Sequence, residues 1–343
     1  ALLFAGLGIQ SSVAGVPSKQ FQQIQQYQMI VSENPSATNQ DKANLEEVLK
    51  GQDIQAYQKI YSKTLDKNFK DKAGLQTITL MMTEKEDLNP FIHLQHHQQE
   101  LTLKDGVVIT AKLAQLAGVK VGQTLEIEGK KLKVAAIAEN YVGHFIYMSQ
   151  ASYEQIYGQL PQANTYLVSL RDTSATSIER QAGLLMNQSA VSGVVQNASA
   201  IRLFDSVASS LNQTMTILII VSVLLAIVIL YNLTNINVAE RIRELSTIKV
   251  LGFHNNEVTL YIYRETIVLS LVGIVLGLVS GFYLHQFLIQ MISPATILFY
   301  PQVGWEVYVI PVAAVSIILT LLGFFVNHHL RKVDMLEALK SVE

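Results

Sequence analysis

The sequence predicts a membrane protein in which an α-helical transmembrane bundle carries a large extracytoplasmic α+β domain. Three observations predict this fold class: a high apolar content, three long uncharged segments, and a one-sided distribution of Lys and Arg. Half of the 343 residues are hydrophobic, 15% are charged, and the mean hydropathy is +0.28. A chain of this length and composition is too apolar to be an ordinary soluble protein.

The composition also excludes several classes of function. The formal net charge is -2 and the chain has no dense run of Lys and Arg, so it lacks the electrostatic footprint of a nucleic-acid-binding protein. It has no cysteine, which excludes disulfides, thiolate metal sites and a cysteine nucleophile. We expect no nucleic-acid partner and no cofactor.

Residues 1–15 are expected to be a truncated first transmembrane helix. The segment is apolar from Ala1 to Ile9, but it has neither an initiator Met nor a basic flank, so it does not have the pattern of a signal peptide. We interpret it as the outer half of a membrane helix whose start is missing.

Residues 16–212 are expected to form the extracytoplasmic α+β domain, because apolar residues recur there with both helical and strand periods. Predicted helices cover 39–51 and 177–191, and predicted strands cover 75–82, 123–128, 132–138 and 164–170. Residues 107–117 are predicted to form a strand and then a helix that ends at Gly118. A hairpin is expected around Gly129 and Lys130, and a long helix is expected to start at Ala200.

Residues 213–343 are expected to contain the three full spans. A helix needs about 20 apolar residues to cross a bilayer. The segments 215–233, 266–292 and 307–326 meet this length; none of them contains Asp, Glu, Lys or Arg, and His285 is their only histidine. Three such segments in so short a stretch make buried helices of a soluble protein an inferior interpretation.

The charges in the short loops predict the orientation, because Lys and Arg near span ends stay on the cytoplasmic side. Basic residues occur in the loop 235–264 and in the C-terminal tail, whereas the loop 293–306 has none. We therefore expect a multi-pass protein of the plasma membrane with residues 16–212 outside and the loop 235–264 and the C-terminus in the cytoplasm.

Signatures of catalysis are missing. The sequence has no Gly-x-x-x-x-Gly-Lys-Ser/Thr, no His-Glu-x-x-His and no Gly-x-Ser-x-Gly. His93, His96 and His97 resemble metal ligands, since residues 93 and 97 would share a helix face. Asn89-Pro90 and the following glutamines favour an exposed polar loop instead, and a zinc site stays the alternative. His285 is expected to lie at the membrane interface, with a proton relay as the alternative.

The inner loop is the most informative segment. On a helix, Glu240 can pair with Arg243 and Arg241 with Glu244, while Leu245 lies on a separate apolar stripe. Such a helix suits docking onto a cytoplasmic partner, and a helix lying on the membrane surface is the alternative.

In the second span, Gly273, Gly277 and Gly281 recur every four residues. Small residues at this spacing let helix backbones approach closely in membranes. We expect a helix to pack against this ridge, contributed by this chain or by another chain.

Residues 235–252, with the sequence NINVAERIRELSTIKVLG, and the tail 331–339 resemble the FtsX-like permease domain of ABC transporters grouped with MacB. The segment 107–158 is similar to outer domains of large permeases from Gram-positive bacteria. The chain therefore resembles either a trimmed subunit or the second half of a longer duplicated permease.

This resemblance implies a non-catalytic permease subunit. ATP hydrolysis by a separate ATPase would drive motion of the outer domain (mechanotransmission), for export or extraction of a peptide, lipid or lipoprotein. The helix 200–233 would be the lever, and a second permease half or copy would complete the transporter. The residues implied to contact the ATPase are Glu240, Arg241, Arg243, Glu244, Leu245 and Lys249.

Two other classes of function stay open. A sensor or scaffold would bind a partner outside, such as a cell-wall hydrolase or an antimicrobial peptide, and signal without transport. A membrane-anchored enzyme would require the histidine cluster to be a metal site.

Overall fold

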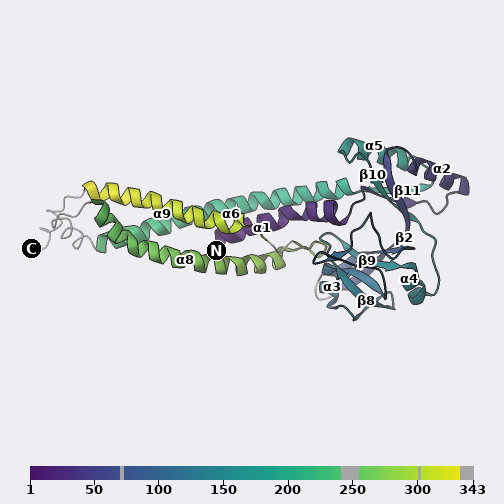
Figure 1. The fold of residues 1–343 in the computed structure, drawn as a ribbon, viewed down its shortest axis with the longest axis horizontal. Coiled ribbons are helices and arrows are strands. Elements are labelled where there is room, and N and C mark those ends of the chain that lie inside the picture. The colour runs from purple at the N-terminus through teal and green to yellow at the C-terminus, as the bar shows by residue number, and fades with distance from the viewer. Residues whose placement is uncertain (70–72, 241–254, 300–302, 333–343) are drawn as a thin grey trace, which may run out of the picture. The chain divides into compact units, whose positions relative to one another are not determined.

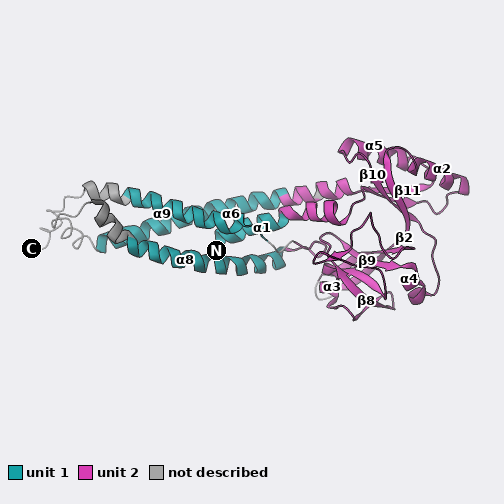
Figure 2. Cartoon of the chain, in the orientation of Figure 1, with its two compact units in different colours: residues 1–13, 209–292, 301–343 teal, residues 14–208, 293–300 magenta. Residues whose placement is uncertain are grey.

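The computed structural model describes residues 1–69, 73–240, 255–299 and 303–332. The chain divides into two compact units (Figure 2). The helical unit comprises Ala1–Val13, Ser209–Ile292 and Pro301–Glu343, and the head unit comprises Ala14–Ala208 and Ser293–Tyr300.

The helical unit takes its described residues from α1 (Leu2–Ser18), α6 (Asn197–Glu240), α8 (Asn255–Ile292) and α9 (Glu306–Lys332). Within the described residues, three helices are long and apolar enough to cross a membrane: Asn197–Glu240, Arg264–Ile292 and Glu306–Phe325. The predicted spans 215–233 and 266–292 lie within the first two, and the predicted span 307–326 ends one residue beyond the third. The predicted fold class, apolar membrane helices with a large mixed α/β domain, is confirmed.

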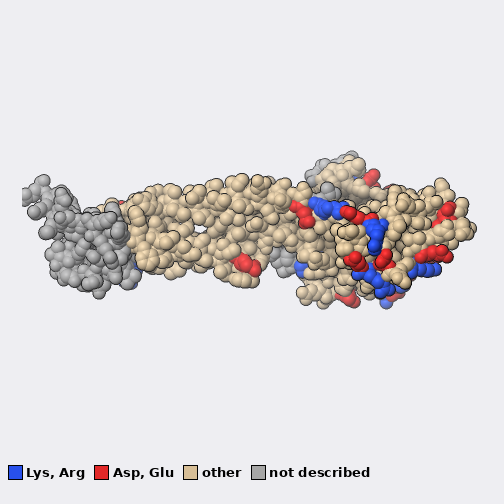
Figure 3. Space-filling model, turned by 90° about the horizontal axis from the view of Figure 1, so that it is seen from above, with Lys and Arg blue, Asp and Glu red and all other residues tan. Residues whose placement is uncertain are grey.

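Apolar side chains cover the outside of these helices. Leu224, Val275 and Leu321 are each more than half exposed. On the face shown in Figure 3, charged side chains gather on the head unit, and few lie on the helical unit. An apolar surface of this extent is unfavourable in water and suits contact with lipid.

The head unit begins with the end of α1 and a π-helix, η1 (Lys19–Ile24). Its other helices are α2 (Asn39–Leu49), α3 (Ala111–Ala117), α4 (Gln150–Tyr157), α5 (Ala175–Met186) and the start of α6. Its described strands are β1 (Met29–Glu33), β2 (Ile54–Phe69), β3 (Gly74–Thr83), β4 (Gln95–His96), β5 (Gln99–Glu100), β6 (Val107–Thr110), β7 (Thr124–Ile127), β8 (Lys130–Ala138), β9 (His144–Ser149), β10 (Thr165–Leu170) and β11 (Val191–Gln196).

Most of these strands belong to one mixed sheet (Figure 1). Among the described residues it has nine strands in the order β11-β1-β10-β2-β3-β9-β6-β8-β7, and β4 and β5 form a separate hairpin. The pairs β3–β9 and β6–β8 are parallel, and the other neighbours are antiparallel.

The long strand β2 joins two hydrophobic cores. Its residues 54–60 pair with β10, and its residues 61–69 pair with β3. Ile54 belongs to a buried cluster with β1, β10, α2 and α5, whereas Leu65 and Phe69 belong to a cluster with β3, β6, β8, β9 and α3. A register shift lies between Ile54 and Ala56 of β2, and Tyr57 packs against the first cluster as Tyr61 packs against the second.

Several predicted elements are confirmed. The helix at 39–49, the strands at 74–83, 124–127, 130–138 and 165–170, and the strand and helix at 107–117 lie where the patterns placed them. Gly118 ends α3 in a left-handed conformation. The β7–β8 hairpin is also confirmed, but its turn residues are Glu128 and Gly129, both with positive φ, one residue earlier than expected.

Other expectations were wrong or incomplete. The helix predicted for 177–191 ends at Met186, because Val191 begins β11, which pairs with β1. The strands β1, β2 and β9 were not predicted. Strand β2 shows no strict alternation of buried and exposed residues, and a register shift lies between Ile54 and Ala56.

Because Leu65 is 1% exposed in one core and Leu75 is 67% exposed, the same substitution at each tests the role of β2. Leu65→Ala should destabilise the head by about 2–5 kcal/mol through lost burial and a cavity. Leu75→Ala should change stability by less than about 0.5 kcal/mol. Thermal unfolding of the full chain in detergent measures both, and equal shifts would show that β2 does not stabilise the core.

Candidate functional site

The residues predicted to contact an ATPase are only partly within the described chain. Glu240 ends α6 and is exposed. Arg241, Arg243, Glu244, Leu245 and Lys249 lie outside the described residues, so their role stays a prediction.

The glycine ridge lies on α8 in the helical unit. An ideal Cβ at Gly281 would lie 2.8 Å from Cβ of Phe4 and 3.2 Å from Cα of Ala1. A Cβ at Gly277 would lie 3.5 Å from the backbone nitrogen of Ala1, and one at Gly273 would meet nothing within 4 Å. The start of α1 thus approaches the Gly281 end of this ridge closely.

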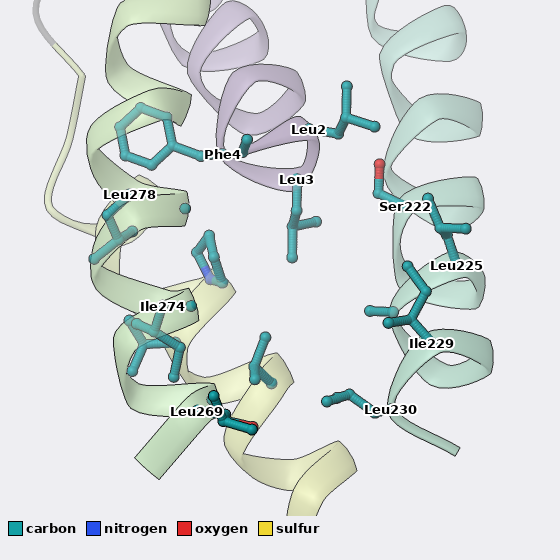
Figure 4. A pocket seen from close by; sticks show the side chains of 18 of the residues that line it. Leu2, Leu3, Phe4, Ser222, Leu225, Ile229, Leu230, Leu269, Ile274 and Leu278 are labelled. Carbon is teal, nitrogen blue, oxygen red and sulfur yellow. The ribbon is translucent and has the colours of Figure 1, made fainter. Parts of the chain in front are cut away.

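At the Gly273 end, the helices surround an apolar cavity of about 450 Å³ (Figure 4). Leu3 of α1, Leu225 of α6 and Ile274 of α8 border it. Its only lining side chains with a polar atom are Ser222 and Ser270. This lining offers no acid, base or metal ligand, so it does not supply the groups that catalysis needs.

His285 lies between helices of the helical unit, and its expected place at the membrane interface stays a prediction. Its side chain is fully buried, and its Nε2 lies 3.0 Å from the hydroxyl of Ser12 on α1. Gly8 makes this approach possible, since a Cβ there would lie 2.7 Å from a ring carbon of His285. A buried imidazole with a hydroxyl partner is a packing contact between α1 and α8.

The histidine cluster forms part of a short hairpin rather than an irregular loop. His97 and Gln98 occupy the turn between β4 and β5 with φ of 48° and 65°, and the rings of His96 and His97 lie 4.3 Å apart. Nε2 of His93 lies 3.7 Å from a carboxylate oxygen of Glu100. No group of three or more potential metal ligands occurs among the described residues.

The most connected polar site of the head unit is a junction around residues 140–143. Gln20 of η1 and Asn140 are 0% and 1% exposed. The amide of Gln20 donates to Oδ1 of Asn140 at 2.8 Å and accepts from the backbone N–H groups of Tyr141 and Val142. Asn140 donates in turn to the carbonyls of Val142 and Gly143. Both buried amides are therefore satisfied, as burial requires.

The same backbone also holds the segment that follows α8, residues 293–299, here called the strap. Val142 and Ile297 form an antiparallel bridge. The N–H of Gly143 donates to the carbonyl of Thr296, and the N–H of Leu298 donates to that of Tyr141, both at 2.8 Å. The strap residue Phe299 is 3% exposed. The strap is thus bound to the head by backbone hydrogen bonds and by burial.

The start of α6 is held by the chain just after η1. The N–H of Asn197 donates to the carbonyl of Gln28 at 2.9 Å, and its side-chain amide donates to the carbonyl of Tyr27. Three chain segments that continue into membrane helices are therefore hydrogen-bonded within the head: η1 after α1, the first residue of α6, and the strap between α8 and α9.

Lys112 and His144 are two buried titratable residues of the head. Nζ of Lys112 donates to Oγ of Ser293 at 3.2 Å, and burial lowers the pKa of this lysine. Burial, and secondarily the charge of Lys112, lowers the pKa of His144, whose ring nitrogens have no hydrogen-bond partner. His144 is therefore neutral in the folded head at neutral pH.

Sequence patterns missed this junction. Gln20 lies among four other glutamines within seven residues, and nothing in that run distinguishes the one that is buried. Asn140 and Gly143 belong to a segment singled out by resemblance, but its partners lie more than 100 residues away. Periodicity reports local structure, so it gives no signal for such contacts.

Parts of this chain are similar to known proteins. Residues 216–335, about a third of the chain, match the FtsX-like permease C-terminal family. A search of curated proteins finds no match. The chain is similar to the periplasmic region of MacB from Actinobacillus actinomycetemcomitans, at 12% identity over 53% of this chain and 94% of that one, with a TM-score of 0.31. It is also similar to the extracellular domain of the noncanonic ABC-type transporter YknZ from Gram-positive bacteria, at 15% identity over 49% and 98%, with a TM-score of 0.29.

Because His144 is neutral in the folded head, we expect the head to lose stability at acidic pH. Its folded pKa is depressed, so the unfolded chain binds more protons once the pH falls below about 6.5. The free energy of unfolding should therefore decrease as the pH falls below this value, by up to about 1.4 kcal/mol per pH unit. His144→Phe should flatten this dependence in thermal unfolding, whereas His96→Phe, at an exposed position, should not. Equal pH dependence in both variants would contradict the assignment.

Proposed function

From the match of residues 216–335 to the FtsX-like permease C-terminal family, we infer that this chain is the permease subunit of an ABC transporter. The family match is the observation that carries this proposal. The three helices long and apolar enough to cross a membrane support it, since they are found within or around the matched segment.

The energy source is a separate cytoplasmic ATPase. The chain has no P-loop sequence, so it cannot hold ATP in the manner of such ATPases. The ATPase binds the loop 235–264 through Glu240, Arg241, Arg243, Glu244, Leu245 and Lys249. A second permease half or copy completes the membrane part.

Force travels along α6, the continuous helix from Asn197 to Glu240. Motion of its inner end reaches Tyr27 and Gln28, because Asn197 is hydrogen-bonded to both carbonyls. A rigid helix with a hydrogen-bonded terminus transmits displacement better than a flexible linker does. The extracytoplasmic head then acts on a peptide, lipid or lipoprotein for export or extraction.

The proposal requires the head and the loop 235–264 to lie on opposite sides of the membrane. The chain has no cysteine, so single cysteines give labelling without background. In intact cells a membrane-impermeant maleimide should label Ser36→Cys, which is exposed on the head, and should not label Ser246→Cys in the loop. After cell lysis both should react. Labelling of both in intact cells would place them on the same side and remove the basis for mechanotransmission.

The proposed contact with the ATPase predicts an uncoupled variant. In proteoliposomes with the ATPase, Arg241→Ala combined with Glu244→Ala should reduce permease-stimulated ATP hydrolysis to near the level of the ATPase alone, because both ionic contacts are lost. The exposed ion pair of Lys104 and Glu86, 3.0 Å apart in the head, gives a matched control. Replacing both of its residues by Ala should leave stimulation unchanged.

Unchanged stimulation in the Arg241→Ala and Glu244→Ala variant would remove the coupling role. Flux measured in the same vesicles separates transport from signalling. ATP hydrolysis without movement of any peptide or lipid would favour the sensor or scaffold over the exporter.

A further inference from the structure

Two of the chain segments that continue into membrane helices end on different hydrophobic cores of the head. The first core contains residues of β1, β10, α2 and α5, and the second core contains residues of β3, β6, β8, β9 and α3. Strand β2 contributes Ile54 to the first core and Leu65 to the second. The contacts of each segment decide which core it reaches.

Helix α6 reaches the first core. Its first residue, Asn197, donates its backbone N–H to the carbonyl of Gln28, the residue before β1. The next residue, Ala198, packs against the first core. Directly before α6, β11 pairs with β1 and buries Val191 in the same core. A displacement of α6 therefore acts on β1, β11 and the first core.

The strap reaches the second core through the segment before β9. It begins at Ser293, the residue after the end of α8, and its backbone is hydrogen-bonded to Tyr141 and Gly143. Strand β9 follows Gly143 directly and lies between β3 and β6 in the sheet. Its residues Ile146 and Met148 belong to the second core. A displacement of α8 therefore acts on β9 and the second core.

Helix α3 holds the strap at a second point. Lys112 of α3 is 8% exposed, and its Nζ donates to Oγ of Ser293 at 3.2 Å. The hydroxyl of Ser293 donates in turn to the carbonyl of Ile297 at 2.6 Å, and Ile297 forms the bridge to Val142. Leu113, the neighbour of Lys112 in α3, belongs to the second core. Both attachments of the strap are therefore on the side of the second core.

Strand β2 joins the two cores at the point where its pairing partner changes. Ile60 pairs with Thr165 of β10, and the next residue, Tyr61, pairs with Met82 of β3. In the described sheet, β2 lies between β10 and β3, so these two strands are connected through it. A few residues between two packed bodies are the kind of place where hinge motion occurs.

We propose that the head is moved at two separate points, with α6 acting on the first core and the strap acting on the second. Motion of α8 against α6 then turns one core relative to the other about residues 60–61 of β2. This inference rests on the proposed function, because ATP hydrolysis supplies the motion. It adds a second connection, which the path along α6 alone does not require.

Two spin labels, one beside each core, measure this rotation in nanodiscs that contain the full chain and the ATPase. Glu47→Cys on α2 and Gln115→Cys on α3 provide the attachment sites, since both positions are exposed and the chain has no cysteine of its own. Addition of ATP should shift the distance between the two labels, because the cores are pulled by different helices.

A flexible Gly-Ser insertion of about six residues between Ile292 and Ser293 makes the connection from α8 to the strap slack. This slack variant should lose the ATP-dependent shift and keep the melting temperature and the permease-stimulated ATP hydrolysis. The matched control is the same insertion between Gln159 and Leu160, two exposed residues that follow α4, and it should keep the shift.

A separate measurement shows whether the strap stays bound to the head in the slack variant. Val142 and Ile297 form a non-hydrogen-bonded antiparallel pair, and the Cα atoms of such pairs lie close enough for a disulfide. Val142→Cys combined with Ile297→Cys should therefore form a disulfide on oxidation, with and without the insertion. Failure to form it in the slack variant would overturn the proposal, because the contacts of the strap would not hold it.

A distance shift that persists in the slack variant would also overturn the proposal. ATP hydrolysis stimulated by the parent chain without any distance shift would overturn it and leave the proposed function intact. Absence of both stimulation and shift in the parent chain would contradict the proposed function itself, and this inference with it.

Discussion

The buried amide pair of Gln20 and Asn140 is the interaction on which the polar junction of the head depends. Each amide can be buried only because its donors and acceptors are satisfied, and loss of either side chain would leave one buried group of the other without its partner, at a cost of about 1–3 kcal/mol. The pair holds the backbone of residues 140–143 in one conformation. That backbone is also the docking site of the strap, so the geometry of the strap depends on the same two side chains.

Strand β2 connects the two hydrophobic cores of the head. It pairs with β10 along one half and with β3 along the other, so it belongs to both cores. A slip of one residue would turn its buried side chains outward, so the register is strongly specified.

Two buried titratable side chains of the head lack full compensation. Burial favours the neutral form of both His144 and Lys112, and the ring nitrogens of His144 have no hydrogen-bond partner. Core stability alone does not explain them, since apolar residues would serve it better.

The sequence by itself determined the three membrane helices, because a run of apolar residues as long as a bilayer is thick is a local property. It also determined the strands 74–83 and 165–170, which are rich in apolar residues, and the α3 stop at Gly118. Tertiary structure alone decided the place of β2 between two cores, the burial of Gln20 and His285, and the attachment of the strap. Each of these depends on partners far away in the chain, and the local pattern of apolar and polar residues contains no record of such contacts.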